Sequence, residues 1–204
     1  MVELFGIFLL KKLTGKSKTD IENILDKYNS LPQLKNIIII YDYIFLGFSR
    51  LVASSIIPKT IIISFGWIKK VIESDDTTTE NAFLITLGHE LTHKKEEVSK
   101  RYFLKKMDRK FINWVNEVHA DFGAAKEMVN GSRDLLIKST EYKLALKPYN
   151  KDSYSHPSWT RRLEYATNYN FDELLIRKIA NDTSFENELL LKKVLKHFSP
   201  IILN

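Results

Sequence analysis

Cysteine is absent from this chain of 204 residues. Neither a disulfide framework nor a zinc site of the cysteine type can therefore form. The absence is typical of a reducing compartment, so we expect a cytoplasmic location. Internal repeats and low-complexity linkers are lacking as well. A chain of this length without such a linker predicts one domain, or one domain with an appendage.

Hydrophobic runs long enough to span a bilayer are also lacking. The run in MVELFGIFLLKKL follows Glu3 rather than basic residues, and no small-residue cleavage site comes after it, so it is a poor signal peptide. We expect a buried helix here, and an interfacial helix with Lys11 and Lys12 at the lipid headgroups is the less favoured alternative. The run NIIIIYDYIFLGF contains Asp42 and is rich in β-branched and aromatic residues, which predicts strand.

The charge is unbalanced, with 31 Lys and Arg against 25 Asp and Glu and a net charge of +6. Such an excess either covers an ordinary solvated surface or attracts nucleic acid or an anionic membrane face. No nucleic-acid-binding motif accompanies it, so we expect no nucleic-acid partner. Peripheral membrane contact is the less favoured alternative.

Histidine is scarce, with five in the chain, yet two of them form H-E-x-x-H in the stretch LGHELTHKK. By chance this motif would occur in on the order of one in a hundred chains of this length and histidine content, so its context must support it. On a helix, His89 and His93 lie one turn apart on one face and can bind one ion. Glu90 lies beside them, close enough to reach a water on that ion without being a ligand.

Apolar residues of the same helix predict a second face that packs in the hydrophobic core. Leu84, Leu87, Leu91 and Val98 fall opposite the histidines. Gly88 costs about 1 kcal/mol relative to Ala inside a helix, which suggests that another backbone packs closely there.

A third ligand is expected from the stretch NEVHADFGAA, because catalytic zinc takes three protein ligands and keeps a fourth position for water. Glu117 and Asp121 share one helix face, and Ala120 and Ala124 beside them are small enough to let a second helix approach. Glu117 can bind the metal, while Asp121 can accept the N–H of a ligating histidine and orient it. His119 points about 200° away from Glu117, so both cannot face the same ion.

A last group of polar residues lies in YSHPSWTRRLEYA. Either Ser155 or Ser158 would cap a helix with Pro157 at its start. His156 precedes this helix and Arg162 lies on it. Both are either incidental or supply a donor and a cation beside a reacting carbonyl.

The order H-E-x-x-H, E-x-x-A-D, H-P-x-x-x-x-R resembles the gluzincin metallopeptidases, and within them the HtpX and CAAX-prenyl-protease family with its soluble relatives, the minigluzincins. The resemblance covers about residues 50 to 166. It implies a zinc-dependent endopeptidase with one Zn²⁺ per chain and a protein or peptide substrate. The residues that it implies are the metal ligands His89, His93 and Glu117, the catalytic Glu90, the orienting Asp121, and His156 and Arg162, which assist the transition state and hold the site together.

The resemblance also implies a zincin-like fold of the α+β class, with a small N-terminal sheet whose edge strand lies near LVASS and a mainly helical part that carries the motif. Many family members are embedded in membranes, whereas this chain lacks a spanning helix, which favours a soluble member. The oligomeric state is left open. We expect an N-terminal helical extension at 1–35, the metallopeptidase domain at 36–169 and a C-terminal helical extension at 170–204.

Two other functions compete with this interpretation. An ImmA/IrrE-like regulatory metallopeptidase that cleaves a repressor also carries H-E-x-x-H and a later Glu, but no helix-turn-helix is evident here. A catalytically silent, zinc-stabilised interaction module would not need Glu90, since structural zinc sites are normally closed. The apolar tail FSPIILN either covers the cleft or, as we favour, packs as an ordinary C-terminus.

Helix caps and periodicity predict the order of the elements. Capping boxes at Thr19 and Thr77 would open two helices, Asp108 would cap a third, and Thr183–Glu186 would cap the last. The expected strands are 37–48, 50–55 and 60–65, and the expected helices are 19–31, 66–74, 77–100, 108–130, 133–146, 158–168, 172–180 and 184–197.

Overall fold

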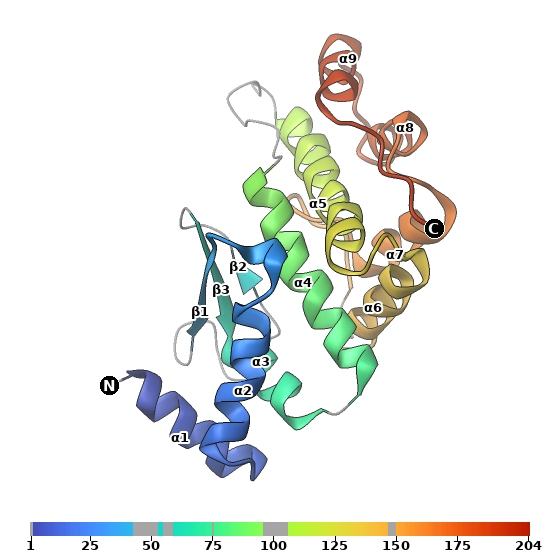
Figure 1. The fold of residues 1–204 in the computed structure, drawn as a ribbon. Helices are drawn as coiled ribbons and strands as arrows, with labels where there is room; N and C mark the ends of the chain where they lie inside the picture. Colours follow the sequence, from blue (N-terminus) through green and yellow to red (C-terminus); the bar gives the residue numbers. More distant parts are fainter. Residues whose placement is uncertain (1, 43–52, 55–58, 75, 96–105, 147–149) are drawn as a thin grey trace.

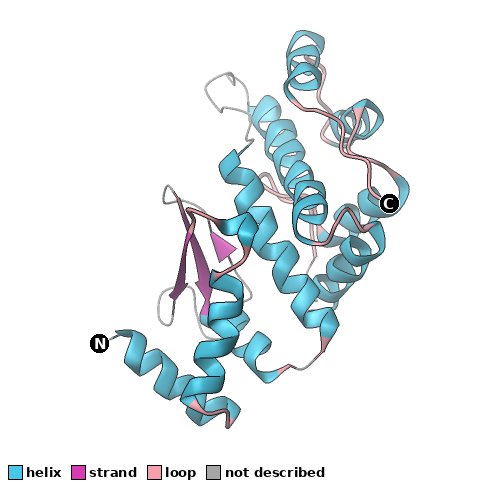
Figure 2. Ribbon diagram, in the orientation of Figure 1, coloured by secondary structure: helices cyan, strands magenta, loops and turns pink. Residues whose placement is uncertain are grey.

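A computed structural model describes residues 2–42, 53–54, 59–74, 76–95, 106–146 and 150–204. Its strands form a small sheet, and most of the other described residues are helical, which confirms the α+β class (Figures 1 and 2). The helices are α1 (Val2–Thr14), α2 (Lys18–Asn29), α3 (Phe65–Glu73), α4 (Thr77–Lys95), α5 (Lys106–Met128), α6 (Arg133–Ala145), α7 (Trp159–Asn168), α8 (Glu173–Asp182) and α9 (Glu188–His197), with a short 3₁₀ turn at Pro32–Leu34.

The sheet has the order β1-β3-β2, so the last strand in sequence lies in the middle. The strand β1 (Ile38–Asp42) runs parallel to β3 (Thr60–Ser64), and β2 (Ala53–Ser54) runs antiparallel to it. The central strand is almost wholly buried and reads TIIIS, as expected of a strand covered on both faces. The expected strands are thus found in part, and their segments 43–52 and 55 lie outside the described residues.

The long helix α4 separates two hydrophobic clusters. The first lies between α4, the sheet and α1–α3, and the second lies among α5–α9 and the C-terminal tail. Figure 1 shows α4 in green, with the sheet on one side and α5 and α6 on the other. No helix in the described part of the chain is long and apolar enough to cross a bilayer.

The caps of several helices differ from the expected ones. The capping box of α2 is made by Ser17 and Asp20 rather than Thr19, because the Ser17 hydroxyl accepts from the Asp20 amide and the Asp20 carboxylate accepts from the Ser17 amide. At α4 the side chain of Asp76, not Thr77, accepts from the first amides. The helix α5 begins at Lys106, so Asp108 lies inside its first turn and cannot be the N-cap.

The last helix also starts later than expected. Thr183 ends α8, and Ser184 takes a φ of 54°, which turns the chain out of the helix. Asn187 then caps α9, its side chain accepting from the Leu190 amide. The short turn lets Phe185 enter the core, where its ring stacks on Phe111 at 4.0 Å.

Both chain ends are attached to the body. In the part of α1 whose side chains are described, residues 7–14, Leu10 is fully buried but Phe8 is 64% exposed, so one face packs and another faces solvent, where a buried helix was expected. The C-terminal tail packs as an ordinary C-terminus. Ile201 pairs with Phe171, the Asn204 amide donates to the Gly131 carbonyl, and the Asn204 carbonyl accepts from the Arg133 amide at the start of α6.

Candidate metal centre

The helices α4 and α5 approach each other closely where the site lies. A Cβ atom added to Gly88 would be only 2.9 Å from Ala124 Cα, and one added to Gly123 would be 2.7 Å from the Thr92 side chain. Glycine at these two positions therefore lets the helix backbones come together. The expectation of close packing at Gly88 is confirmed, and Ala124 is the small residue that faces it.

Burial of α4 extends further round the helix than its sequence pattern indicates. Leu87 and Leu91 are buried in the cluster on the sheet side, as expected, while Leu84 is half-buried. Ile85 faces the other cluster. Val98 and the expected end of this helix, residues 96–100, lie outside the described residues. The histidine face is thus enclosed between neighbouring helices rather than exposed on a surface.

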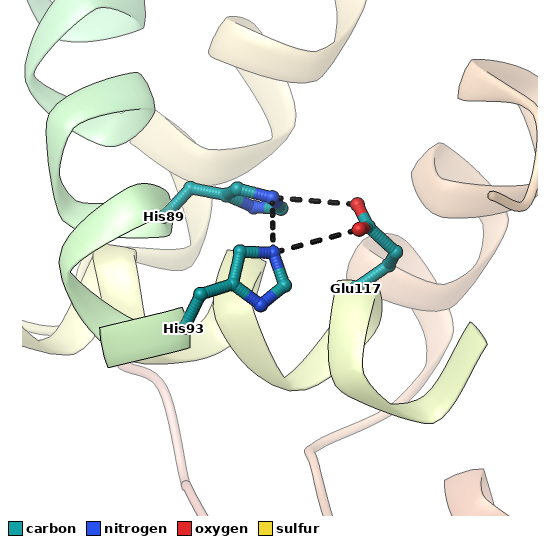
Figure 3. Close-up of side chains that lie close together, drawn as sticks. All are labelled: His89, His93 and Glu117. Carbon is teal, nitrogen blue, oxygen red and sulfur yellow. Dashed lines mark hydrogen bonds and ion pairs between the residues drawn. The ribbon is translucent and has the colours of Figure 1, made fainter. Parts of the chain in front are cut away.

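His89, His93 and Glu117 converge on one point between α4 and α5 (Figure 3). The two Nε2 atoms are 3.0 Å apart, and the Glu117 carboxylate oxygens lie 3.3 Å from His89 Nε2 and 3.5 Å from His93 Nε2. Ligand atoms around a tetrahedral zinc ion with bonds of about 2.0–2.1 Å are about 3.3–3.4 Å apart. The separations and the two-nitrogen, one-oxygen donor set therefore fit an ion of this kind.

The orientation of His89 is fixed from behind. Its Nδ1 lies 3.0 Å from Asp121 Oδ1, and because a carboxylate only accepts, Nδ1 carries the hydrogen. In the neutral ring the lone pair of Nε2 is therefore directed at the centre of the group. Asp121 is held in turn by the guanidinium of Arg162, whose Nε donates to Oδ2 at 2.6 Å and whose Nη2 donates to Oδ1. The indole of Trp159 covers this guanidinium at 4.1 Å.

The charges of the group are strongly coupled. Burial disfavours the charged form of His89, but hydrogen bonds to Asp121 and Glu117 outweigh it and raise the pKa of His89 to about 9. Burial likewise opposes ionisation of Glu117, yet hydrogen bonds from His89 and His93 hold the pKa of Glu117 well below its usual value. Asp121 and Glu117 thus favour a positive charge between α4 and α5. A metal ion can supply this charge in place of the proton on His89.

The acid at Asp121 and the base at Arg162 stabilise each other's charge. Burial opposes ionisation of Asp121, but the charge of Arg162 and the hydrogen bond from His89 outweigh it and lower the pKa of Asp121. Burial would lower the pKa of Arg162, but the charge of Asp121 and its hydrogen bonds raise it. This buried pair is therefore ionised at neutral pH.

Of the remaining predicted site residues, His156 lies at the rim of the group. His156 Nε2 is 3.3 Å from Glu117 Oε1, so the loop before α7 reaches the candidate metal ligands. Burial lowers the pKa of His156 although the charge of Glu117 opposes this shift. Glu90 is half-buried and, among the described residues, is not a member of the ligand group.

His119 lies apart from the group, as its position on the helix predicts. Its ring packs against Phe171 at 4.8 Å and Phe198 at 4.4 Å, in the cluster on the far side of α5. Burial lowers the pKa of His119 to about 4. This histidine is therefore a core residue, and Glu117 is the member of the pair that faces α4.

The structure decides between the two candidate caps near His156. Ser158 is the N-cap of α7, which leaves Ser155 to contact the imidazole of His156 at 2.7 Å. Pro157 precedes the cap and does not start the helix. Sequence reasoning assigned no site role to Trp159 or Ser155, and their position beside His156 in the chain is the signal that could have indicated one.

Comparison of the chain with models of protein families, with curated proteins and with solved structures finds no match. The functional interpretation therefore rests on the geometry of the group and on the sequence motifs.

Proposed function

We propose that this protein is a zinc-dependent endopeptidase with a zincin-like fold, related to the HtpX and CAAX-prenyl-protease family. The observation that carries the proposal is the convergence of His89, His93 and Glu117, with separations that fit one tetrahedral ion and with Glu90 of the H-E-x-x-H motif outside the ligand set. Three protein ligands leave one position open for water, as in catalytic rather than structural zinc sites.

The residues around this centre have distinct roles in peptide hydrolysis. Zinc, when bound, supplies a Lewis acid that polarises the scissile carbonyl and lowers the pKa of water. Glu90 accepts a proton from the attacking water and delivers it to the leaving amine. Asp121 and Arg162 hold His89 in the tautomer that offers Nε2 to the ion. His156, on the rim, donates a hydrogen bond to the oxygen that becomes negative.

An extended peptide is the substrate that the surroundings favour. The strand β2 is at one edge of the sheet as described and lies against α4. An edge strand can bind an extended segment through backbone hydrogen bonds. A segment bound there would lie beside α4, the helix that carries His89 and His93, which supports a protein or peptide substrate.

Replacement of Glu90 by Gln tests the proposal. We expect Glu90→Gln to lower kcat for an internally quenched peptide library by about 100-fold or more, since general acid–base catalysis contributes this much. Zinc content should stay at one per chain, because Glu90 is not a ligand. Glu80→Gln is the matched control, because Glu80 lies on the same helix and pairs with Lys27 at the surface.

Two results would contradict the proposal. One is zinc-loaded protein that cleaves none of the peptides, which would leave an interaction module as the better interpretation. The other is loss of zinc in Glu90→Gln, which would make this residue a ligand.

A further inference from the structure

A chain of hydrogen bonds connects α5 to the backbone of His156. The indole Nε1 of Trp114, a fully buried residue one turn before Glu117, donates to the Ser153 carbonyl at 2.9 Å. The Ser153 hydroxyl accepts from the His156 amide at 2.9 Å and donates to the His156 carbonyl at 3.0 Å. The segment that carries His156 is thus attached to the helix that carries Glu117.

The ring of His156 has a partner on each side. Its Nδ1 is 2.7 Å from Ser155 Oγ, and its Nε2 is 3.3 Å from Glu117 Oε1. Because the carboxylate only accepts, Nε2 must carry a hydrogen. In the neutral ring Nδ1 is then an acceptor, so the Ser155 hydroxyl donates to it. A ring turned by 180° would place carbon against this hydroxyl and lose the hydrogen bond.

We infer that Ser155 and Trp114 are positioning residues for His156. Trp114 fixes where the segment lies on α5, and Ser155, on the other side of the ring from Glu117, adds to the preference for the neutral form with its hydrogen on Nε2. This inference rests on the proposed function, in which the Nε2–H donates to the oxygen that becomes negative during hydrolysis. Both residues act through His156, and neither is expected to touch the substrate.

Nitrogen NMR of the imidazole rings in zinc-loaded protein at pH 8 tests the role of Ser155. The unsubstituted protein should show His156 with its hydrogen on Nε2. Ser155→Ala should give a mixture of the two neutral forms, and Ser155→Thr, which keeps the hydroxyl, should restore the Nε2–H form. Ser30→Ala is the control, because Ser30 is an exposed serine at the C-cap of α2, and it should leave the ring form of His156 unchanged.

Peptide hydrolysis and zinc content complete the test. Ser155→Ala should lower kcat by about 10-fold with little change in KM, a smaller loss than the about 100-fold expected for removing an oxyanion donor. Trp114→Phe, which keeps an aromatic ring but loses the N–H, should lower kcat and mix the two forms of His156. Zinc should stay at one per chain in every variant.

An Nδ1–H form of His156 in the unsubstituted protein, or an unchanged Nε2–H form in Ser155→Ala, would overturn the inference. The NMR result does not require turnover. If no peptide is cleaved but Ser155→Ala still mixes the two forms, the proposed function fails while the positioning of His156 stands.

Discussion

Replacing Gly88 by Ala probes the close approach of α4 and α5 on which the metal centre depends. The added Cβ would clash with Met128 Cγ and would lie 2.9 Å from Ala124 Cα and 3.0 Å from Ala124 Cβ. The Met128 side chain can turn away, but the Ala124 backbone cannot. The two helices would have to separate by several tenths of an ångström, which would shift His89 relative to Glu117.

Whether Gly88→Ala lowers or raises the free energy of unfolding distinguishes a tight contact between α4 and α5 from an exposed helix. In an exposed helix, Gly→Ala stabilises by about 1 kcal/mol. Overpacking of a tight core costs about 1–3 kcal/mol. Because the contact is with backbone, we expect the cost to lie at the upper end and the free energy of unfolding to fall by about 1–2 kcal/mol net. Zinc affinity should fall as well.

Urea unfolding of the metal-free variants measures the loss. Gly123, the other glycine at the contact between α4 and α5, provides a comparison. A Cβ at Gly123 would be 2.7 Å from the outer atoms of Thr92 but 3.3 Å from its Cβ. Thr92→Ala should therefore rescue much of the loss in Gly123→Ala, when scored as a double-mutant cycle. Met128→Ala should not rescue Gly88→Ala. An unchanged or increased stability of Gly88→Ala would refute the close approach.

Three further predictions concern the residues around the centre. Asp121→Asn should weaken zinc binding by about 10- to 100-fold in a chelator competition titration, and unchanged affinity would remove Asp121 from its orienting role. Arg162→Met removes the arginine that neutralises the buried Asp121 carboxylate, so urea unfolding should show a loss of about 3–5 kcal/mol, and a loss below about 1 kcal/mol would contradict the buried pair. His119 has its pKa lowered to about 4, so as pH falls from about 6.5 to 4 the unfolded state takes up the proton first and stability declines. A pKa difference corresponds to about 1.4 kcal/mol per unit, so His119→Gln should reduce this fall in the free energy of unfolding by about 3 kcal/mol. An equally steep fall in the variant would contradict a buried neutral ring.

Local periodicity is sufficient to predict much of the site. The spacing of His89 and His93, and that of Glu117 and Asp121, follows from the helix repeat alone, and the structure brings these four side chains together. The same geometry correctly separates His119 from Glu117. The metal-binding role of the ligands remains a prediction.

Two kinds of feature could not be predicted: which of several neighbouring polar residues caps a helix, and contacts between segments distant in the sequence. Several Ser, Thr and Asp residues adjoin the start of α2 and α4, and the sequence does not show that Ser17 and Asp76 would take the capping positions. Burial of α4 on two sides depends on where α5 and α6 pack. The contact of Ser155 with His156 depends on the loop conformation before α7, which no period describes.

X-ray absorption at the zinc edge of protein loaded with one equivalent of zinc tests the central claim most directly. The account predicts tight binding of one zinc per chain, with two imidazole nitrogens at about 2.0–2.1 Å and oxygen from Glu117 and water at about 2.0–2.2 Å. Glu117→Ala should remove the tight site, whereas His119→Ala should keep the spectrum unchanged. Failure to bind stoichiometric zinc, or a spectrum that changes in His119→Ala and not in Glu117→Ala, would contradict the metal centre described above.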